Sequence, residues 1–226
     1  APPPIVYTAD IFDAESLRLV SEHPIHVNCG SPDMIDQYGA VAPGRAITLR
    51  INPGFGHGHS QKTNTGGEQS KHGIWHEQLG DCLSRAKRRD LTVTGLHMHI
   101  GSGADMEHLA QVCGSMEKTA LAAGPSIESI SAGGGLPTPY RPGDAPIDLH
   151  VYFSLWDAAR KRIEDKLGHR VSLEIEPGRY LVAESGALLT EVRAVKKQGA
   201  LDYVLVDAGF SLVLQQRKDE GAWPEG

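Results

Sequence analysis

Several features that would assign this 226-residue chain to a specialised class are scarce or missing. Cys29, Cys82 and Cys113 are its only thiols, and they form no CxxC pair, which is typical of a reducing compartment. No apolar run approaches the ~18 residues of a membrane span, and the first residues do not resemble an export signal. We therefore expect a soluble cytoplasmic protein that has no membrane partner.

Positive charge is also in short supply. Lys and Arg number 22 against 28 Asp and Glu, giving a net charge of −6, and the longest basic block is Lys87–Arg89. Nucleic-acid binding depends on neutralising phosphates, so this balance excludes a nucleic-acid partner. What the chain does have is glycine, 26 residues in all, many of them in the polar stretch Gly54–Gly67.

Short apolar or β-branched runs alternate with helical patterns along the chain. Strands are predicted at Ile5–Ala9, Ile25–Cys29, Ile47–Asn52, Val93–Ile100, Ile127–Ala132 and Val171–Glu176. Helices are predicted at Ala14–Ser21, at His76–Arg88, along Leu109–Ala120 and along Trp156–Leu167 with a cap at Gly168. This alternation predicts βαβ units and a parallel sheet.

The sequence pattern changes after Arg179, where Ala187–Val195 and Leu201–Val206 predict two successive strands joined by a Lys-Gln-Gly turn. An open doubly wound sheet would fit the first part, but a GxGxxG turn after the first strand is absent. Unusual residues gather instead at the carboxyl ends of strands, where barrel active sites form. The predicted fold is α/β: a partial (β/α)8 barrel over residues 1–186, the start of a β-sandwich domain over 187–210, and an unassigned tail over 211–226.

Glycines follow two of these strands. Gly133, Gly134 and Gly135 end one strand, and Gly178 with Arg179 follows the next. Backbone N–H groups can approach a phosphate closely where no Cβ intervenes, and barrels often bind phosphate after their last two strands. The alternative is that the glycines only form a tight turn.

His97 and His99 share one face of a strand end. They could be hydrogen-bonded core histidines, or metal ligands completed by His57, His59 or Cys29, as in metal-dependent barrel hydrolases. A third interpretation places one imidazole flat against a ring cofactor whose phosphate is cupped by the segment Gly101–Gly103.

Glu174 and Glu176 also share a strand face, and a buried carboxylate needs a partner. Arg179 could be that partner for Glu176. Alternatively, Glu176 could face the protonated ring nitrogen of pyridoxal phosphate.

Together these motifs resemble a known family. The stretches that carry the resemblance are Asn52–Trp75, Leu96–Gly103 (LHMHIGSG), Ser131–Leu136 (SAGGGL), Glu176–Tyr180 (EPGRY) and Val206–Phe210 (VDAGF). They resemble the diaminopimelate decarboxylases, in the alanine-racemase-like, barrel-containing pyridoxal phosphate family that also includes ornithine decarboxylase. The resemblance runs almost continuously from Ile5 to Phe210 and implies decarboxylation of meso-2,6-diaminopimelate to L-lysine.

The resemblance also implies roles for individual residues. His99 would stack on the pyridine ring, Glu176 would face its nitrogen, and Arg179 would also lie near an amino-acid substrate. The implied cofactor-binding set is His99, Ser102, Gly133, Gly134, Gly135, Glu176, Pro177, Gly178 and Arg179. A full-length family member is expected to be a homodimer.

Two family features have no counterpart in the sequence. The lysine that forms an imine with the cofactor stands at the end of the first barrel strand, whereas this chain resembles the family from the third strand onward. The segment Ser211–Gly226 does not align with the family's C-terminal domain, which carries a catalytic cysteine. We therefore expect an internal fragment that contains no catalytic residue and is inactive alone.

Three alternatives stay open. A relative in the same family could act on arginine or ornithine, a metal-dependent hydrolase could use His97 and His99, and a non-catalytic relative could bind pyridoxal phosphate without an imine.

Overall fold

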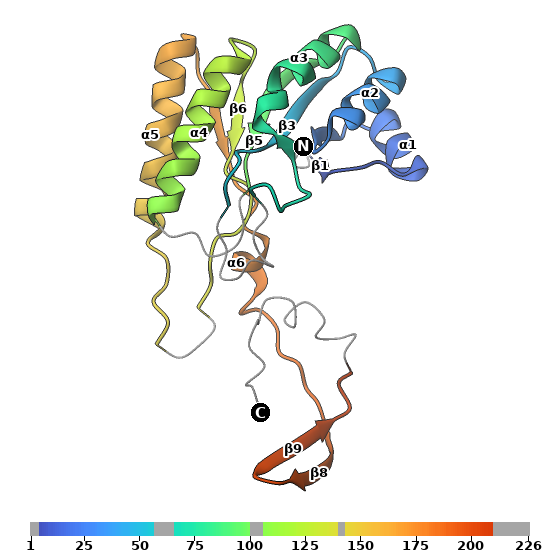
Figure 1. The fold of residues 1–226 in the computed structure, drawn as a ribbon, viewed down its shortest axis with the longest axis vertical. Coiled ribbons are helices and arrows are strands. Elements are labelled where there is room, and N and C mark those ends of the chain that lie inside the picture. Colours follow the sequence, from blue (N-terminus) through green and yellow to red (C-terminus); the bar gives the residue numbers. More distant parts are fainter. Residues whose placement is uncertain (1–4, 57–65, 100–105, 140–142, 210–226) are drawn as a thin grey trace.

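The computed structural model describes residues 5–56, 66–99, 106–139 and 143–209. Six parallel strands form one curved sheet in the order β1-β2-β3-β5-β6-β7 (Figure 1). They are β1 (Val6–Ala9), β2 (His26–Cys29), β3 (Ala46–Asn52), β5 (Thr92–His97), β6 (Ser129–Ser131) and β7 (Ser172–Glu174). A two-residue strand, β4 (Ile74–Trp75), pairs in parallel with the end of β3.

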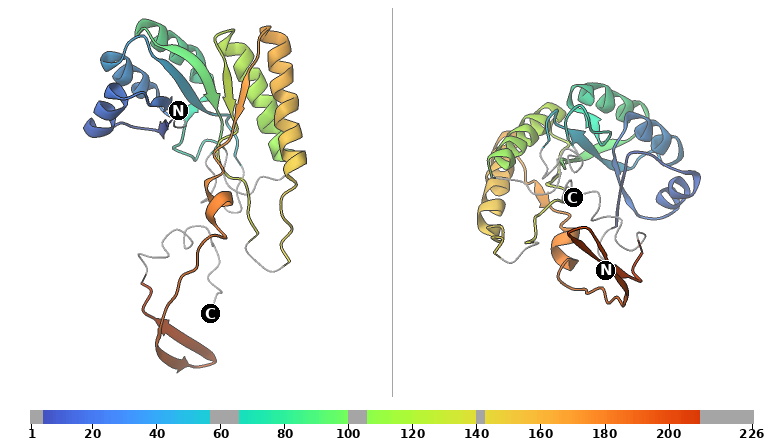
Figure 2. Two further views of the ribbon diagram at one scale, coloured as in Figure 1. Left: turned by 180° about the vertical axis from the view of Figure 1, so that it is seen from behind. Right: turned by 60° about the horizontal axis from the view of Figure 1, so that its bottom comes forward.

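Helices follow these strands and cover the outer face of the sheet. They are α1 (Ala14–Glu22), α2 (Pro32–Val41), α3 (Leu79–Arg88), α4 (Met106–Ala123) and α5 (Leu149–Leu167). The short α6 (Gly178–Val182) lies beyond the strand ends and covers no part of that face (Figure 1). A single 3₁₀ turn, η1 (His76–Gln78), precedes α3. Seen from below, the helices form an arc around the outside of the strands (Figure 2). The result is a half barrel, which confirms the predicted α/β barrel architecture.

Alternation along the strands divides the sheet into two faces. Ile47, Leu49 and Ile51 of β3 are at most 1% exposed and belong to one apolar cluster with residues of the covering helices. Thr48 and Arg50, between them, point to the concave side. Stability therefore comes mainly from the outer face, where sheet and helices pack.

Two local signals explain where helices begin and end. Asp13 caps α1 through its carboxylate, which accepts from the backbone N–H of Ser16 at 2.7 Å, and the Ser16 hydroxyl accepts from the N–H of Asp13 in return. Gly168 ends α5 with a φ of 79°, a left-handed conformation that glycine adopts without steric cost. Both boundaries follow from residues visible in the sequence.

Some predicted boundaries are wrong. The predicted strand Ala187–Val195 is instead β8 (Val192–Gln198), so Lys197 and Gln198 of the predicted turn lie within the strand. The chain turns at Ala200 and at Gly199, which has a φ of 59°. The strand predicted at Val171–Glu176 shortens to β7, which lies at one end of the sheet; Glu174 ends it, Glu176 follows it, and both are exposed. The helix α2 was not predicted; Pro32 at its first turn and the apolar Met34, Ile35 and Tyr38 form it.

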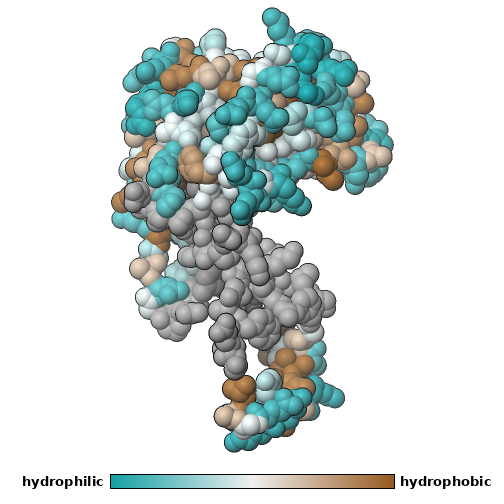
Figure 3. Space-filling view, viewed as in Figure 1, coloured by the Kyte–Doolittle hydropathy of each residue, from teal (hydrophilic) through white to brown (hydrophobic). Residues whose placement is uncertain are grey.

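The second sheet is the antiparallel hairpin of β8 and β9 (Leu201–Val206). It lies apart from the half barrel in each view of the ribbon (Figures 1 and 2). Its apolar side chains, among them Val195 and Val204, are exposed, and brown patches mark this part of the surface (Figure 3). Among the described residues, no helix is long and apolar enough to cross a membrane.

Candidate functional site

The concave face of the half barrel holds a cavity of about 540 Å³. Its lining is mostly polar and comes from all the main strands or their carboxyl ends: Val6, Thr8, Asn28, Thr48, His97, Ser131, Glu174, Ile175 and Glu176. Parallel register places these side chains on one face, because Thr8 pairs with Asn28, Asn28 with Thr48, and Ser131 with both His97 and Glu174. The volume is within the range of small-molecule sites.

His97 and Glu176 form a direct pair in this cavity. The His97 Nε2 lies 3.1 Å from Oε2 of Glu176. The imidazole side chain is only 2% exposed, whereas the carboxylate is 44% exposed on the open side. The hydrogen bond from His97 lowers the pKa of Glu176, Arg50 acts in the same direction, and burial opposes them. The carboxylate is therefore held in its ionised form.

His99 lies two residues beyond His97 and close to the glycine turn. Burial, together with the charge of Arg50, lowers the pKa of His99 to about 4, so this imidazole is neutral at physiological pH. A Cβ placed on Gly133 would lie 2.7 Å from the Cβ of His99, and one on Gly134 would lie 2.9 Å from the carbonyl oxygen of Glu176. The chain segments that follow β5, β6 and β7 therefore come so close together that only glycine fits at these two positions.

Arg50 brings a cation to the same end of the sheet. It stands opposite His97 in the β3–β5 register; burial lowers the pKa of Arg50, and the charges of Asp10 and Glu176 offset only part of that effect. Asp10, at the end of β1, in turn contacts His72: the Oδ2 of Asp10 lies 2.6 Å from Nδ1 of His72, and its Oδ1 accepts from the N–H of Gly73 at 3.0 Å. Charged groups thus extend from β7 across to β1.

Asn52 fixes the polypeptide that follows β3. Its side chain is 4% exposed and accepts from the N–H groups of Gly54 at 3.1 Å and Gly67 at 2.8 Å. Its amide donates to the carbonyl oxygens of Gly67 at 3.0 Å and His72 at 3.4 Å. One buried amide therefore joins both ends of the glycine-rich segment to the sheet.

The structure brings most of the sequence-predicted residues together. His99, Gly133, Gly134 and Glu176 meet at the strand ends, and Gly135 adopts a φ of 89° beside them. Pro177 precedes α6, which begins at Gly178 and contains Arg179. Ser102, with Gly101 and Gly103, lies outside the described residues, as do His57 and His59.

One interpretation needs correction. The argument that Glu174 and Glu176 are buried is wrong, because β7 ends the sheet and both side chains face an open cavity. His97 is a hydrogen-bonded histidine of the barrel face. Within the described ranges, no group of three or more His, Cys, Asp or Glu side chains is placed to hold a metal ion.

Sequence reasoning missed Arg50, Asn52 and His72. A signal for the first two was present: in Leu49-Arg50-Ile51-Asn52 the apolar residues alternate with polar ones, so Arg50 and Asn52 must face the concave side. The pairing of His72 with Asp10 joins residues 62 positions apart and left no such signal.

Comparisons of this chain with known proteins all indicate the same family. Residues 1–183 match the family described as "Pyridoxal-dependent decarboxylase, pyridoxal binding domain". The chain is 56% identical over 210 residues to the diaminopimelate decarboxylase of Escherichia coli (strain K12), which covers 93% of this chain and 50% of that protein. It is 59% identical over 208 residues to the enzyme of the same name from Streptomyces coelicolor, covering 92% of this chain and 47% of that protein.

Solved structures agree with these matches. A crystal structure of diaminopimelate decarboxylase superposes with a TM-score of 0.86 at 57% identity, covering 91% of this chain and 49% of that one. The Helicobacter pylori enzyme complexed with L-lysine superposes with a TM-score of 0.74 at 27% identity, covering 91% of this chain and 52% of that one. The chain spans about half the length of the curated relatives it matches.

Proposed function

This chain belongs to the pyridoxal-dependent decarboxylases through their pyridoxal binding domain, and we propose that its concave cavity binds pyridoxal phosphate for the decarboxylation of meso-2,6-diaminopimelate to L-lysine. The observation that carries the proposal is the group of an ionised Glu176, a neutral His99 and a glycine turn at the strand ends. When bound, the cofactor serves as an electron sink for the bond that breaks.

The residues present fit this cofactor. The ionised Glu176 is suited to hold a protonated ring nitrogen, and the neutral imidazole of His99 can lie against an aromatic ring without a charge to desolvate. The turn Gly133–Gly135 leaves room for backbone N–H groups to approach a phosphate, with Ser102, Pro177, Gly178 and Arg179 completing the proposed set. Arg179 is also proposed to contact the substrate.

Cofactor binding is the first test. Pyridoxal phosphate is titrated into the purified chain and followed by absorbance and by quenching of tryptophan fluorescence. The variant Glu176→Gln is expected to bind at least about tenfold more weakly, since a hydrogen bond to a charged group contributes about 1.5–3 kcal/mol. Glu174→Gln, two residues earlier and in the same cavity, is the matched control and should bind normally. Equal affinity of wild type and both variants would contradict the assignment of Glu176.

None of the described lysines lines the cavity. Cofactor bound to this chain is therefore expected to leave on gel filtration and to resist trapping by borohydride. Covalent trapping would instead assign an imine to a lysine outside the described residues, Lys62 or Lys218.

Substrate choice is the second test. In the protein that carries this chain, lysine should form from meso-2,6-diaminopimelate, and carbon dioxide should not be released from L-ornithine or L-arginine. Release from either of those two amino acids alone would move the protein to another branch of the family. We propose a homodimer for that protein, a cytoplasmic location and no nucleic-acid partner.

We also propose that residues 1–186 form the cofactor-binding domain, 187–210 begin a second domain, and 211–226 lie outside both. The family match to residues 1–183 and the separate sheet beginning at Val192 support this division. Limited proteolysis should cut first between residues 183 and 192.

A further inference from the structure

His97 is the most deeply buried charged or titratable residue of the concave face, and the proposed function gives it no role. It is 1% exposed and stands directly beside Glu176, the residue proposed to face the cofactor ring. A buried polar side chain that touches a functional carboxylate needs an explanation in terms of what it does to that carboxylate.

The geometry determines which atom carries the proton. An ionised carboxylate can only accept, so the Nε2 of His97 must donate to Oε2 of Glu176 across the 3.1 Å contact. The Nδ1 of His97 is buried and has no hydrogen-bond partner among the described residues. A proton on Nδ1 would be an unsatisfied buried donor, whereas a proton on Nε2 is satisfied by the carboxylate of Glu176.

Glu176 is held at two points. Its backbone N–H donates to the carbonyl oxygen of Gly133 at 2.9 Å, and its Oε2 accepts from His97. The carboxylate therefore cannot rotate freely, although its side chain is largely open to the cavity. One oxygen is committed to the barrel wall, and the other remains available on the open side.

We propose that His97 is a positioning residue, whose Nε2–H holds one oxygen of Glu176 so that the other is presented to the nitrogen of a ring lying against His99. The ring in this inference is the ligand of the proposed function, and that part of the inference rests on it. The hydrogen bond between His97 and Glu176 does not depend on the proposed function. Acting through another residue, His97 keeps Glu176 oriented and ionised.

Other charged or titratable groups also surround the carboxylate of Glu176. Arg50 approaches from β3, His99 from the end of β5, and Glu174 lies two residues earlier, at the end of β7. Arg50 acts in the same direction as His97, and the hydrogen bond from His97 has the larger effect of the two on the pKa of Glu176. Removing His97 alone should therefore change the ionisation of Glu176 while the other neighbours remain.

The test titrates Glu176 by carbon NMR in the cofactor-free chain, using glutamate labelled at the carboxyl carbon. His97→Phe, which keeps a ring of similar size but removes the donor, is expected to raise the pKa of Glu176, with about a tenfold change in its ionisation constant. His97→Gln, whose amide can donate, should restore most of the effect. His26→Gln is the matched control: His26 faces the same cavity side but bonds to the Thr48 hydroxyl at 2.9 Å, so it should leave Glu176 unchanged.

An unchanged Glu176 titration in His97→Phe, or no difference between the Phe and Gln variants, would overturn the proposal. Should His97→Phe fail to fold, nitrogen NMR of the wild-type imidazole decides the matter. A proton on Nε2 supports the proposal, and a proton on Nδ1 overturns it.

A second readout uses pyridoxal phosphate labelled at its ring nitrogen. In the wild-type chain this nitrogen should be protonated at neutral pH, and in His97→Phe the protonated fraction should fall. Failure of the wild-type chain to bind the cofactor would reject the proposed function. The Glu176 titration, made without cofactor, would still report on His97.

Discussion

The two faces of the six-stranded sheet are built from the same strands but differ in almost every property. On the outer face, Leu49, Leu96 and Ile130 are completely buried against helices. On the concave face, the residues adjacent to them in the sequence are Thr48, His97 and Ser131, and they line a cavity. Period-two alternation thus separates the residues that stabilise the fold from those that can bind a ligand.

The concave face is unusual for a barrel. Barrel interiors are generally filled by branched apolar side chains, which make them a second core. Here hydroxyl, amide, imidazole and carboxylate groups occupy that side, and the Oδ1 of Asn28 is buried with no hydrogen-bond partner among the described residues. A polar interior contributes less to stability and leaves polar groups ready to contact a ligand.

The contrast between the two faces would be wrong if truncating a side chain lowered the free energy of unfolding equally on both. Leu49→Ala removes a completely buried side chain and should lower the free energy of unfolding by about 2–5 kcal/mol. Thr48→Ala, its neighbour on the concave face, removes a hydroxyl that bonds to His26 and should cost only about 1 kcal/mol. Urea denaturation followed by circular dichroism measures both. Similar losses in the two variants would show that the concave face is as important to stability as the outer one.

Asn52 also lies on the concave face, but its truncation should lower the free energy of unfolding more than that of Thr48. Asn52→Ala removes four hydrogen bonds that join Gly54, Gly67 and His72 to the sheet, and we expect a loss of about 2 kcal/mol. The amide of Gly67 should also exchange its hydrogen faster. Asn28→Ala is the matched control, because within the described part of the chain this buried amide makes one hydrogen bond, to Thr8, and its loss should cost less than about 1 kcal/mol. Normal protection of Gly67 in Asn52→Ala would contradict the role of Asn52.

Sequence alone predicted the outer face better than the concave one. The period-two pattern of β3 and the helical spacing of Trp156, Ala159 and Ile163 depend on local burial, and the structure confirms them. The proposed site residues at strand ends were singled out because glycines and paired histidines are recognisable motifs, and their roles stay predictions. The partner of Glu176 was not determined, because His97 is 79 residues away and only the β5–β6–β7 register brings the two together.

The pH dependence of stability should also come from the concave face. The pKa of His99 is lowered to about 4, so the unfolded chain binds a proton there before the folded chain does. The stabilisation is complete above the ordinary histidine pKa of about 6.5 and is lost as the pH falls towards 4, by up to about 1.4 kcal/mol per pH unit. The lowered pKa of Glu176 extends the loss to still lower pH.

Urea denaturation between pH 7 and pH 4 measures this slope. In His99→Gln the slope between pH 6.5 and pH 4 should become shallower, since the titrating group is gone. Asn28→Ala, which changes no charge and removes a bond to the non-titrating Thr8, should keep the wild-type slope. An identical slope in His99→Gln and wild type would place the acid sensitivity elsewhere in the molecule.

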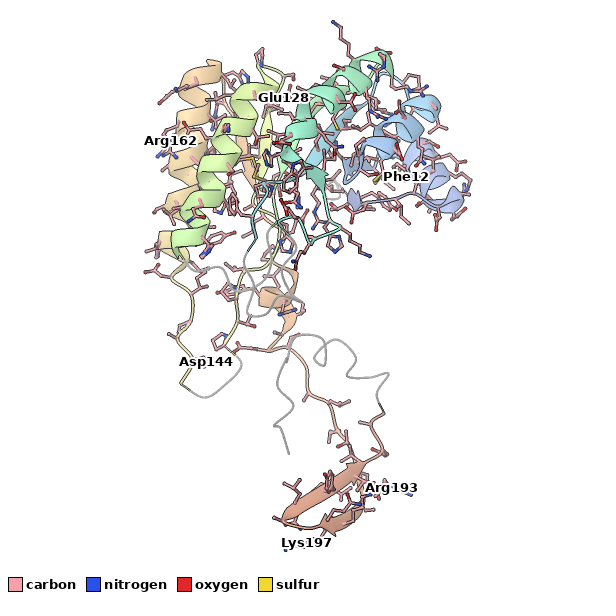
Figure 4. The ribbon with its side chains drawn as sticks, viewed as in Figure 1. Phe12, Glu128, Asp144, Arg162, Arg193 and Lys197 are labelled. Carbon is pink, nitrogen blue, oxygen red and sulfur yellow. The ribbon has the colours of Figure 1, made fainter. Side chains whose placement is uncertain are left out.

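The smallest effect is expected farthest from the sheet, on the solvent side of the helices. Arg162 lies on the outside of α5 and pairs with Glu117 of α4, with 2.7 Å between Nε and Oε2 (Figure 4). Its side chain is 49% exposed, so water screens the pair, and Arg162→Ala should cost less than about 1 kcal/mol. The effect should shrink further in high salt, because dissolved ions screen exposed charges. A loss as large as that in Leu49→Ala would mean that the α4–α5 contact depends on this pair rather than on the apolar residues beneath it, and the contrast between apolar and polar layers would then not extend to the helices.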